Sequence, residues 1–181
     1  MENPSHTAEF MRYMMANRLF FRLYQCTNML HKTGSRAVEA EGLTTQQWAV
    51  LGALSRPKAV KGMNIAELAR YLMLSRQNLA GVVGRMERDG HLTSAPDPND
   101  RRSRLVTMSP KGHRVWKTLA EPKIRAYYDE ALNGFAFKDM VHMLHYLQLM
   151  LDNMSTLDQA DVTEGDQDSE TNQDSKDKTL V

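Results

Sequence analysis

Apolar residues recur at three- and four-residue steps along most of the chain, which is the spacing of amphipathic helices. The first such pattern covers residues 9–36, and it is apolar on more than one side. A helix of that kind has to be covered on more than one side, so we expect it to pack on its own domain and on a second subunit. The last pattern covers residues 137–154. A long helix is therefore predicted near each end of the chain.

Shorter helices are predicted between these two patterns. Thr44 and Gln47 have the spacing of a capping box, and so do Asn64 and Glu67. Ser75 is the expected N-cap of the next helix, which runs to residue 89 and ends at a glycine. Because only a very short turn separates the last two of these helices, the pattern predicts a helix-turn-helix.

A β-hairpin is predicted directly after this pair of helices. Residues 91–96 and 103–108 are the expected strands, and the four residues between 96 and 101 are rich in turn formers. A helix from about 110 to 133 follows, with a kink expected at Pro122. We therefore expect a mainly α fold with a small β-wing: a winged helix-turn-helix DNA-binding domain flanked by a helical dimerisation domain.

Composition divides the chain in the same way. We expect a helical dimerisation region of residues 1–36 and 110–157, a winged helix-turn-helix region of 43–109, and an acidic tail of 158–181. The tail has two Lys against eight Asp and Glu and no aromatic residue, a composition that predicts disorder. Residues 56–114 hold 12 basic and 5 acidic residues. Such a concentration of positive charge is typical of a surface that binds a polyanion.

The helix after Ser75 carries side chains suited to reading DNA. Arginine pairs with guanine in the major groove, and glutamine or asparagine pairs with adenine. Gly81 and Gly84 each cost the helix about 1 kcal/mol relative to alanine, which makes sense if a phosphodiester strand approaches the backbone there. A basic, solvated helix face with glycines packed inside the chain is the alternative. The candidate DNA-contacting residues of this helix are Ser75, Arg76, Gln77, Asn78 and Arg85.

The tip of the hairpin adds Arg101, Arg102 and Arg104 to this set. A narrow minor groove has a strongly negative potential and attracts inserted arginines. Asp100 would repel phosphate if it were free, so we expect it to hold a nearby arginine in position. A soluble, charged turn is the alternative, although so many like charges repel one another unless something neutralises them.

These stretches together resemble the MarR family of bacterial regulators over roughly residues 10–154. The resemblance implies a homodimer that binds a palindromic operator, usually as a repressor. By position it implies that Arg102 enters the minor groove and that Asp100 orients it. The stretches that carry it are Leu43 to Leu51, Ile65 to Ala69, Ser75 to Gly90, Asp97 to Arg102 and Val106 to Gly112.

The resemblance also implies a small-molecule effector, because many relatives bind aromatic carboxylates or phenolics between the dimer and DNA domains. An aromatic carboxylate or its thioester is the expected ligand class here. An arginine on a largely apolar helix can anchor a carboxylate, but it can equally pair with an acid of the chain, and tryptophans are more often core residues. The candidates are Arg18, Arg22, Trp48, His113 and Trp116.

Cys26 is the single cysteine, which excludes an intramolecular disulfide and favours a reducing, cytoplasmic setting. Some family members sense peroxide through a first-helix cysteine with tyrosines nearby, and Tyr24 is close in sequence. A redox-sensing repressor therefore stays open, as does the reading of Cys26 as a small buried hydrophobe.

A non-specific architectural DNA-binding protein is a further alternative. We expect no enzyme and no cofactor, because the sequence has no cluster with metal-ligand spacing and no glycine-rich phosphate loop. No apolar run approaches the length of a membrane span.

Overall fold

The structure, a computed structural model, describes the backbone of residues 4–100 and 102–174 and the side chains of residues 7–100 and 102–158. It is mainly helical with a two-stranded antiparallel sheet, which confirms the predicted fold class. The chain separates into two compact units, residues 1–131 and 132–181. Each unit is described by itself.

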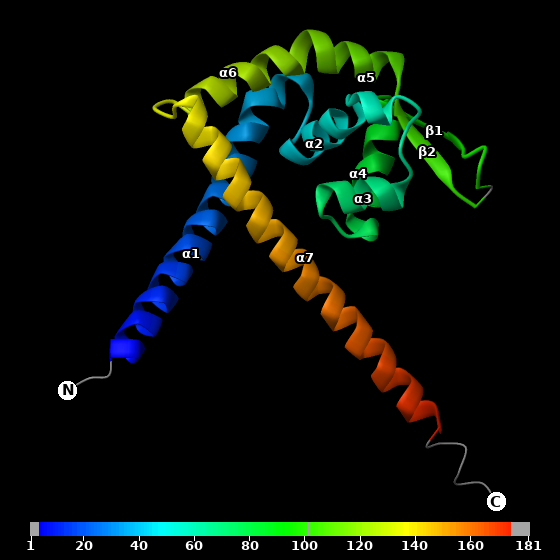
Figure 1. Ribbon diagram of the computed structural model, residues 1–181. Coiled ribbons are helices and arrows are strands. Elements are labelled where there is room, and N and C mark those ends of the chain that lie inside the picture. The colour runs from blue at the N-terminus through cyan, green and yellow to red at the C-terminus, as the bar shows by residue number, and fades with distance from the viewer. Residues whose placement is uncertain (1–3, 101, 175–181) are drawn as a thin grey trace, which may run out of the picture. The chain divides into compact units, whose positions relative to one another are not determined.

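The first unit begins with the long helix and the helix-turn-helix (Figure 1). Both predicted capping boxes are formed, by Thr44 with Gln47 and by Asn64 with Glu67. Short 3-10 turns at Glu39–Glu41 and Pro57–Ala59 connect the helices. The elements in chain order are α1 (Pro4–Val38), α2 (Thr45–Leu54), α3 (Ile65–Leu72), α4 (Arg76–Arg88), β1 (Leu92–Pro96) and β2 (Arg104–Met108).

The helix predicted from 110 to 133 is interrupted. It consists of α5 (Pro110–Arg114), a π-helical turn (Val115–Ala120) and α6 (Glu121–Ala131). The Glu121 N–H donates to the Trp116 carbonyl, one residue further back than in an α-helix. Pro122 follows and has no N–H to continue an α-helical ladder. The irregularity expected at Pro122 thus takes the form of a π-helical turn just before it.

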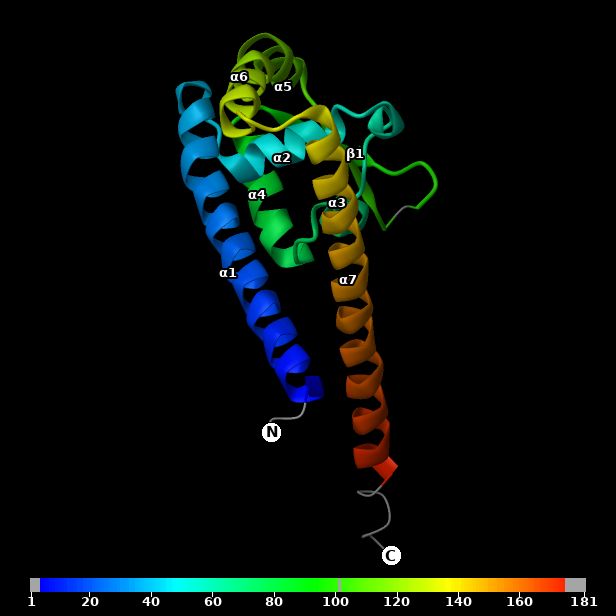
Figure 2. The ribbon, with the colours of Figure 1, turned by 60° about the vertical axis from the view of Figure 1, so that its left-hand side comes forward.

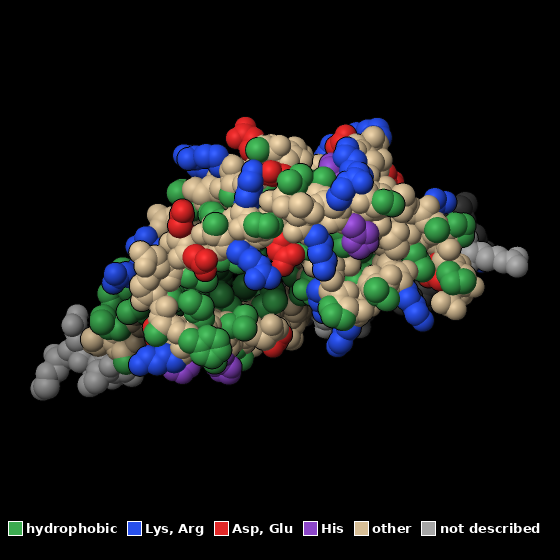
Figure 3. All heavy atoms as spheres, turned by 90° about the horizontal axis from the view of Figure 1, so that it is seen from above, with side chains coloured by type: hydrophobic (Ala, Val, Ile, Leu, Met, Phe, Trp, Pro, Cys, Tyr) green, Lys and Arg blue, Asp and Glu red, His purple; other side chains and the backbone are tan. Residues whose placement is uncertain are grey.

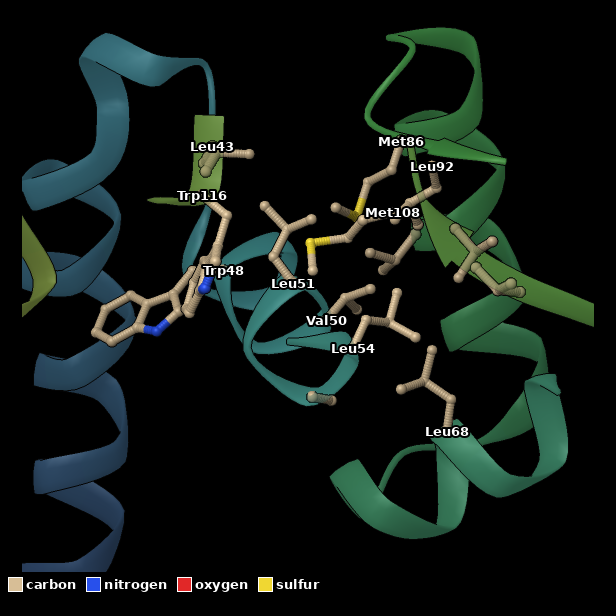
Figure 4. Packing of buried hydrophobic residues seen from close by; sticks show 14 of the residues in the cluster. Leu43, Trp48, Val50, Leu51, Leu54, Leu68, Met86, Leu92, Met108 and Trp116 are labelled. Carbon is tan, nitrogen blue, oxygen red and sulfur yellow. The ribbon is translucent and has the colours of Figure 1, made fainter. Parts of the chain in front are cut away.

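The core of this unit is built around α2, which contacts both α1 and α4; it lies between them in Figure 1, and Figure 2 shows α4 below it. Val50, Leu51 and Leu54 of α2 are buried, and side chains from α4 and the wing meet them (Figure 4). The buried face of α4 is the predicted one: Leu79, Val82, Val83 and Met86. One continuous core therefore fixes the recognition helix and the base of the wing to α2.

The start of the wing is clamped against the start of α5. The Ser109 N–H donates to the His91 carbonyl at 3.0 Å, and Ser109 Oγ donates to the Gly90 carbonyl at 2.6 Å. A side chain at Gly112 would place its Cβ 2.0 Å from the His91 carbonyl oxygen, so only glycine fits at that position. This close packing fixes where the wing leaves the core.

The second unit contains α7 (Phe137–Asp174). Its helix continues past residue 158, whereas composition predicts disorder from there. Extending an existing helix avoids the cost of nucleation, so a polar segment can continue a helix that the preceding residues have already started. Residues 175–181 of the predicted tail lie outside the described residues.

Candidate nucleic-acid interface

The first turn of α4 presents the three predicted base-reading side chains to solvent. Arg76, Gln77 and Asn78 are all exposed. The Asn78 N–H donates to Ser75 Oγ at 3.2 Å, so the predicted N-cap is formed and Ser75 is occupied in holding the helix end. Arg85 lies two turns further along and is also exposed. The turn before α4 is tight because Met73 adopts a left-handed backbone conformation with φ of 53°.

The two glycines of α4 have no packing partner that requires them. A Cβ at Gly84 would meet no heavy atom within 4 Å, and one at Gly81 would meet only the mobile guanidinium of Arg85, at 3.7 Å. Packing within the described chain therefore does not account for either glycine. Both positions are costly in a helix, and close approach by a DNA strand stays the prediction for them.

The wing tip is held by its two aspartates. Asp97 Oδ1 accepts the Asn99 N–H at 2.8 Å, and Asp100 Oδ1 accepts the Arg102 N–H at 2.9 Å. Asp100 therefore holds Arg102, as the sequence predicts, but through the backbone, which leaves the exposed guanidinium free of that contact. Arg101 lies outside the described residues.

Arg104 has a structural contact that the sequence does not reveal. Its Nη2 donates to the Ser94 carbonyl across the hairpin at 2.6 Å. Ser94 Oγ in turn donates to the Glu87 carboxylate on α4. A chain of hydrogen bonds thus runs from the recognition helix through β1 to β2, and it sets the wing at a fixed position relative to α4.

The predicted effector residues do not come together in one place within the described chain. Arg18 and Arg22 line a hollow of about 510 Å³ on α1. His113 and Trp116 line a different, smaller cavity of about 150 Å³ beside the wing. Trp48 lines neither and packs against Tyr127 of α6, with 5.9 Å between the ring centroids.

Sequence reasoning missed a third hollow, of about 690 Å³, between α1 and α6. The Thr33 and Tyr127 hydroxyls, which line it, lie 2.9 Å apart. Lys123, also in its wall, pairs at 2.6 Å with Glu41, whose side chain is only 6% exposed. No periodicity signals this contact, because its partners lie far apart in the sequence.

His91 is a buried titratable group at the wing root. Its side chain is 5% exposed, and its Nδ1 has no hydrogen-bond partner among the described residues. Burial lowers the pKa of His91 below its ordinary value of 6.5, Lys111 lowers it further, and Asp89 acts in the opposite direction. His91 is therefore neutral near pH 7.

Cys26 is exposed on α1 rather than buried. The searched part of the chain contains no group of His, Cys, Asp or Glu that could hold a metal ion. In the same part, no helix is both long and apolar enough to cross a membrane.

Comparison with known proteins agrees with this architecture. Residues 41–103 match the model of the MarR family. The transcriptional activatory protein BadR of Rhodopseudomonas palustris is 69% identical over 144 residues, which cover 80% of this chain and 82% of BadR.

Among solved structures, CouR of Rhodococcus jostii RHA1 bound to p-coumaroyl-CoA is similar, with a TM-score of 0.64 and 23% identity. The match covers 75% of this chain and 92% of that one. The MepR–DNA complex of S. aureus has a TM-score of 0.65 and 14% identity, covering 74% of this chain and 96% of that one. The match to the family model, the extent of the likeness to BadR and the shared fold together establish that the chain belongs to the MarR family of winged helix transcriptional regulators.

Proposed function

We propose that this regulator binds a palindromic DNA operator as a homodimer, with the first turn of α4 in the major groove and Arg102 of the wing in the minor groove. The observation that carries the proposal is the joint presentation of these groups by one core. Arg76, Gln77 and Asn78 are exposed on a capped helix, and Asp100 holds Arg102 on a hairpin tied to that helix. The fold that MepR shows in complex with DNA supports this arrangement.

The dimer is supported by apolar side chains that the described chain leaves exposed. Large contiguous apolar surfaces on a soluble chain mark interaction sites. On α1 they include Phe10, Tyr13, Leu19, Phe20, Phe21 and Tyr24, and on α7 they include Phe137, Val141, Leu144, Tyr146, Leu149 and Leu157. We therefore keep residues 1–36 and 110–157 as the proposed dimerisation region and 43–109 as the DNA-binding region.

We propose activation rather than repression as the direction of control. The resemblance to the family as a whole implies repression, but BadR, at 69% identity, is a transcriptional activatory protein. The same winged helix can serve either outcome, because the position of the operator relative to the promoter decides whether bound protein recruits or blocks the polymerase.

The proposed effector is a small aromatic acid or its thioester. The shared fold of CouR, solved with p-coumaroyl-CoA, supports this ligand class. A ligand can alter DNA binding only if it prefers one protein conformation over the other. In a dimer that conformation sets the distance between the two recognition helices, which must be about 34–36 Å for half-sites one turn apart.

Footprinting on the DNA upstream of the chain's own coding sequence tests the proposal, with and without a panel of aromatic acids and their CoA thioesters. We expect one protected palindrome whose occupancy an aromatic acid or thioester changes. Equal protection along the whole fragment, or equal affinity for random and palindromic duplexes, would instead indicate a non-specific architectural protein.

A redox-sensing regulator is the second candidate, and the exposure of Cys26 on α1 favours it. A sensing thiol has to be accessible to oxidant. The test compares operator release on peroxide treatment between the native chain and Cys26→Ser. Loss of the peroxide response in the variant supports sensing, whereas the same response in both proteins ends this hypothesis.

A further inference from the structure

One side of the DNA-binding region carries cations without acids. Residues 55–63, between α2 and α3, and residues 109–120, from the N-cap of α5 to the end of the π-helical turn, hold six Lys and Arg and no Asp or Glu. No ion pair among the described residues includes any of these six side chains. Both segments line the small cavity beside the wing, so they form one surface. We call it the basic surface, and it consists of Arg56, Lys58, Val60, Lys61, His113 and Lys117.

The basic surface lies away from the side chains proposed to read DNA. Thr107 and Met108, at the base of the hairpin, line its cavity. Arg102 lies in the tip, and the five-residue strands between base and tip span about 14 Å. The base of the hairpin also follows the end of α4 opposite to the base-reading turn, and α4 is about 20 Å long. The proposed operator contacts therefore leave the basic surface without a partner.

Apolar groups at the basic surface favour a protein as that partner. Val60 is 81% exposed, more than any other large hydrophobic side chain described in residues 7–131. Arg56 stacks on the exposed ring of Tyr71, with 4.1 Å from its Cζ to the ring centroid. Aromatic and arginine side chains are enriched at protein–protein interfaces, whereas phosphate contacts need only the charge. Lys, Arg and His side chains lie together on the wing side of the face seen in Figure 3. Such a surface fits an acidic protein better than a DNA backbone.

The cavity has room for one side chain of the partner. The buried Trp116 and Met108 form its wall together with Val60, and its volume is about 150 Å³. A cavity of this size accommodates a group about as large as benzene. Protein interfaces gain much of their affinity from a few such anchors in pockets from which water is excluded. The basic surface therefore fits an acidic segment that carries one leucine or phenylalanine.

The basic surface is fixed before any partner arrives. Met63 and Val106 exchange backbone hydrogen bonds of 3.1 and 2.9 Å, which join the loop to the wing. A Cβ at Gly52 of α2 would lie 3.3 Å from the ring of Trp116, so the indole rests almost directly on the α2 backbone. A preorganised surface loses little conformational freedom on binding.

We propose that the basic surface docks on an acidic surface of RNA polymerase, which places one apolar side chain in the cavity and its carboxylates beside the cations. The inference rests on the proposed activation, because a protein bound at an operator can raise transcription by holding the polymerase at the promoter. Operator binding uses the first turn of α4 and the wing tip, so the basic surface stays accessible to the polymerase in the DNA complex.

The test measures the affinity of the full-length protein for purified RNA polymerase holoenzyme without DNA. Lys58→Glu and Lys117→Glu should each weaken polymerase binding about fivefold or more, because like charges then face each other. Both variants should also lower activation of an operator-bearing promoter at saturating protein. Lys138→Glu, at an exposed position of α7, is the matched control and should leave polymerase affinity unchanged.

Operator affinity, measured by anisotropy, separates protein docking from phosphate contacts. At about 0.15 M salt the Debye length is about 8 Å, so reversing a charge on the distant basic surface should change operator affinity less than about twofold. Val60→Ser should weaken polymerase binding at low and high salt alike, whereas the effect of Lys117→Glu should shrink as salt rises. Circular dichroism identifies any variant that fails to fold.

A photoreactive phenylalanine analogue in place of Val60 identifies the occupant. Crosslinks to a polymerase subunit support the proposal. Crosslinks only to DNA, to residues 158–181 of the chain itself or to a second copy overturn it, as does unchanged polymerase affinity in Lys58→Glu and Lys117→Glu. An equal loss of operator affinity in these variants would assign the cations to phosphate contacts and overturn it too.

Failure of the proposed function gives a different result. If the native protein binds polymerase but no operator, the proposed DNA reading fails and the docking surface remains. If it binds the operator but no polymerase, the docking surface is refuted while DNA binding stands.

Discussion

At the scale of single residues, the structure separates side chains that are free to meet DNA in the proposed complex from those that position the wing. Arg102 is exposed and held by its backbone, whereas Arg104 donates to the Ser94 carbonyl at 2.6 Å. Although sequence alone gives both arginines the same role, their contacts differ. We infer that Glu87, through Ser94 and Arg104, positions the wing rather than contacting bases.

Glu87→Ala tests this positioning role, because loss of the negative charge and loss of the contact with Ser94 would change operator affinity in opposite directions. Removing an acid near phosphate should tighten DNA binding, whereas releasing the wing should weaken it. We expect operator affinity to fall about three- to tenfold, and Glu87→Gln, which keeps a hydrogen-bond acceptor, to restore most of it. Fluorescence anisotropy with labelled operator measures both.

A double-mutant cycle with Arg102→Ala shows whether Glu87 acts through the wing. The loss of operator affinity caused by Glu87→Ala should largely vanish when Arg102 is also replaced by alanine. Full additivity of the two changes would mean that Glu87 does not act through Arg102.

His91 gives the stability of the fold a pH dependence. Because burial lowers the pKa of His91 in the folded chain from 6.5, the unfolded chain binds a proton more readily. The stabilisation is therefore complete above about pH 6.5 and is lost as pH falls through the lowered folded pKa. Urea unfolding at pH 7.5 and 5.5 should show a smaller loss of stability in His91→Gln than in the native chain. His142→Gln, at an exposed position of α7, is the control, and an equal loss in all three proteins would contradict the assignment.

At the scale of elements, the two glycines of α4 lower the stability of this helix relative to alanine at the same positions. Gly81 lies one helical turn after Gln77, on the face that presents the base readers, and its Cβ position is open. Gly81→Ala should raise the free energy of unfolding by about 0.5–1 kcal/mol. The added methyl group should at the same time weaken operator binding.

Denaturant unfolding and anisotropy on the same protein measure these opposed effects. Ala80→Gly, at an exposed position of α4, is the matched control and should lose stability. Stronger operator binding by Gly81→Ala would show that no DNA backbone approaches this face.

The elements that sequence predicts well are those with local signals. Capping by Thr44, Asn64 and Ser75 depends on residues three positions away, so the helix starts follow from spacing alone. The form of the break before Pro122, the Glu41–Lys123 pair and the bond from Arg104 to Ser94 depend on tertiary placement. No periodicity encodes such contacts.

The candidate site also combines residues that local signals predict with residues whose surroundings depend on tertiary placement. The order of the helix-turn-helix and wing is enough to predict Arg76 to Asn78 and Arg102 as the DNA interface, because element boundaries fix those positions. The effector residues were predicted as one set, but the structure distributes Arg18, Trp48 and Trp116 over different surroundings. Cavities depend on which side chains from distant segments fail to fill a space, and sequence does not give that.

At the scale of the whole molecule, the exposed apolar faces of α1 and α7 predict a dimer. Leu144, 68% exposed on α7, is a direct probe of it. Because the side chain is exposed in the single chain, Leu144→Glu should leave helix content unchanged. The dimer would have to bury the new carboxylate at its interface, which is costly, so the variant should be more monomeric than the native protein. Sedimentation velocity measures the assembly, with His142→Glu on the same helix as the control. A monomeric native protein would contradict the proposed dimer.

Joint reading of DNA by α4 and the wing is tested by the operator affinity of the double variant Gln77→Ala with Arg102→Ala, measured by anisotropy over a range of salt concentrations. We expect affinity to fall about 100-fold or more, because a major-groove reader and a minor-groove contact are both removed, and discrimination against random duplex to fall as well. Unchanged affinity and unchanged discrimination in a folded, dimeric variant would contradict the claim that α4 and the wing read DNA together.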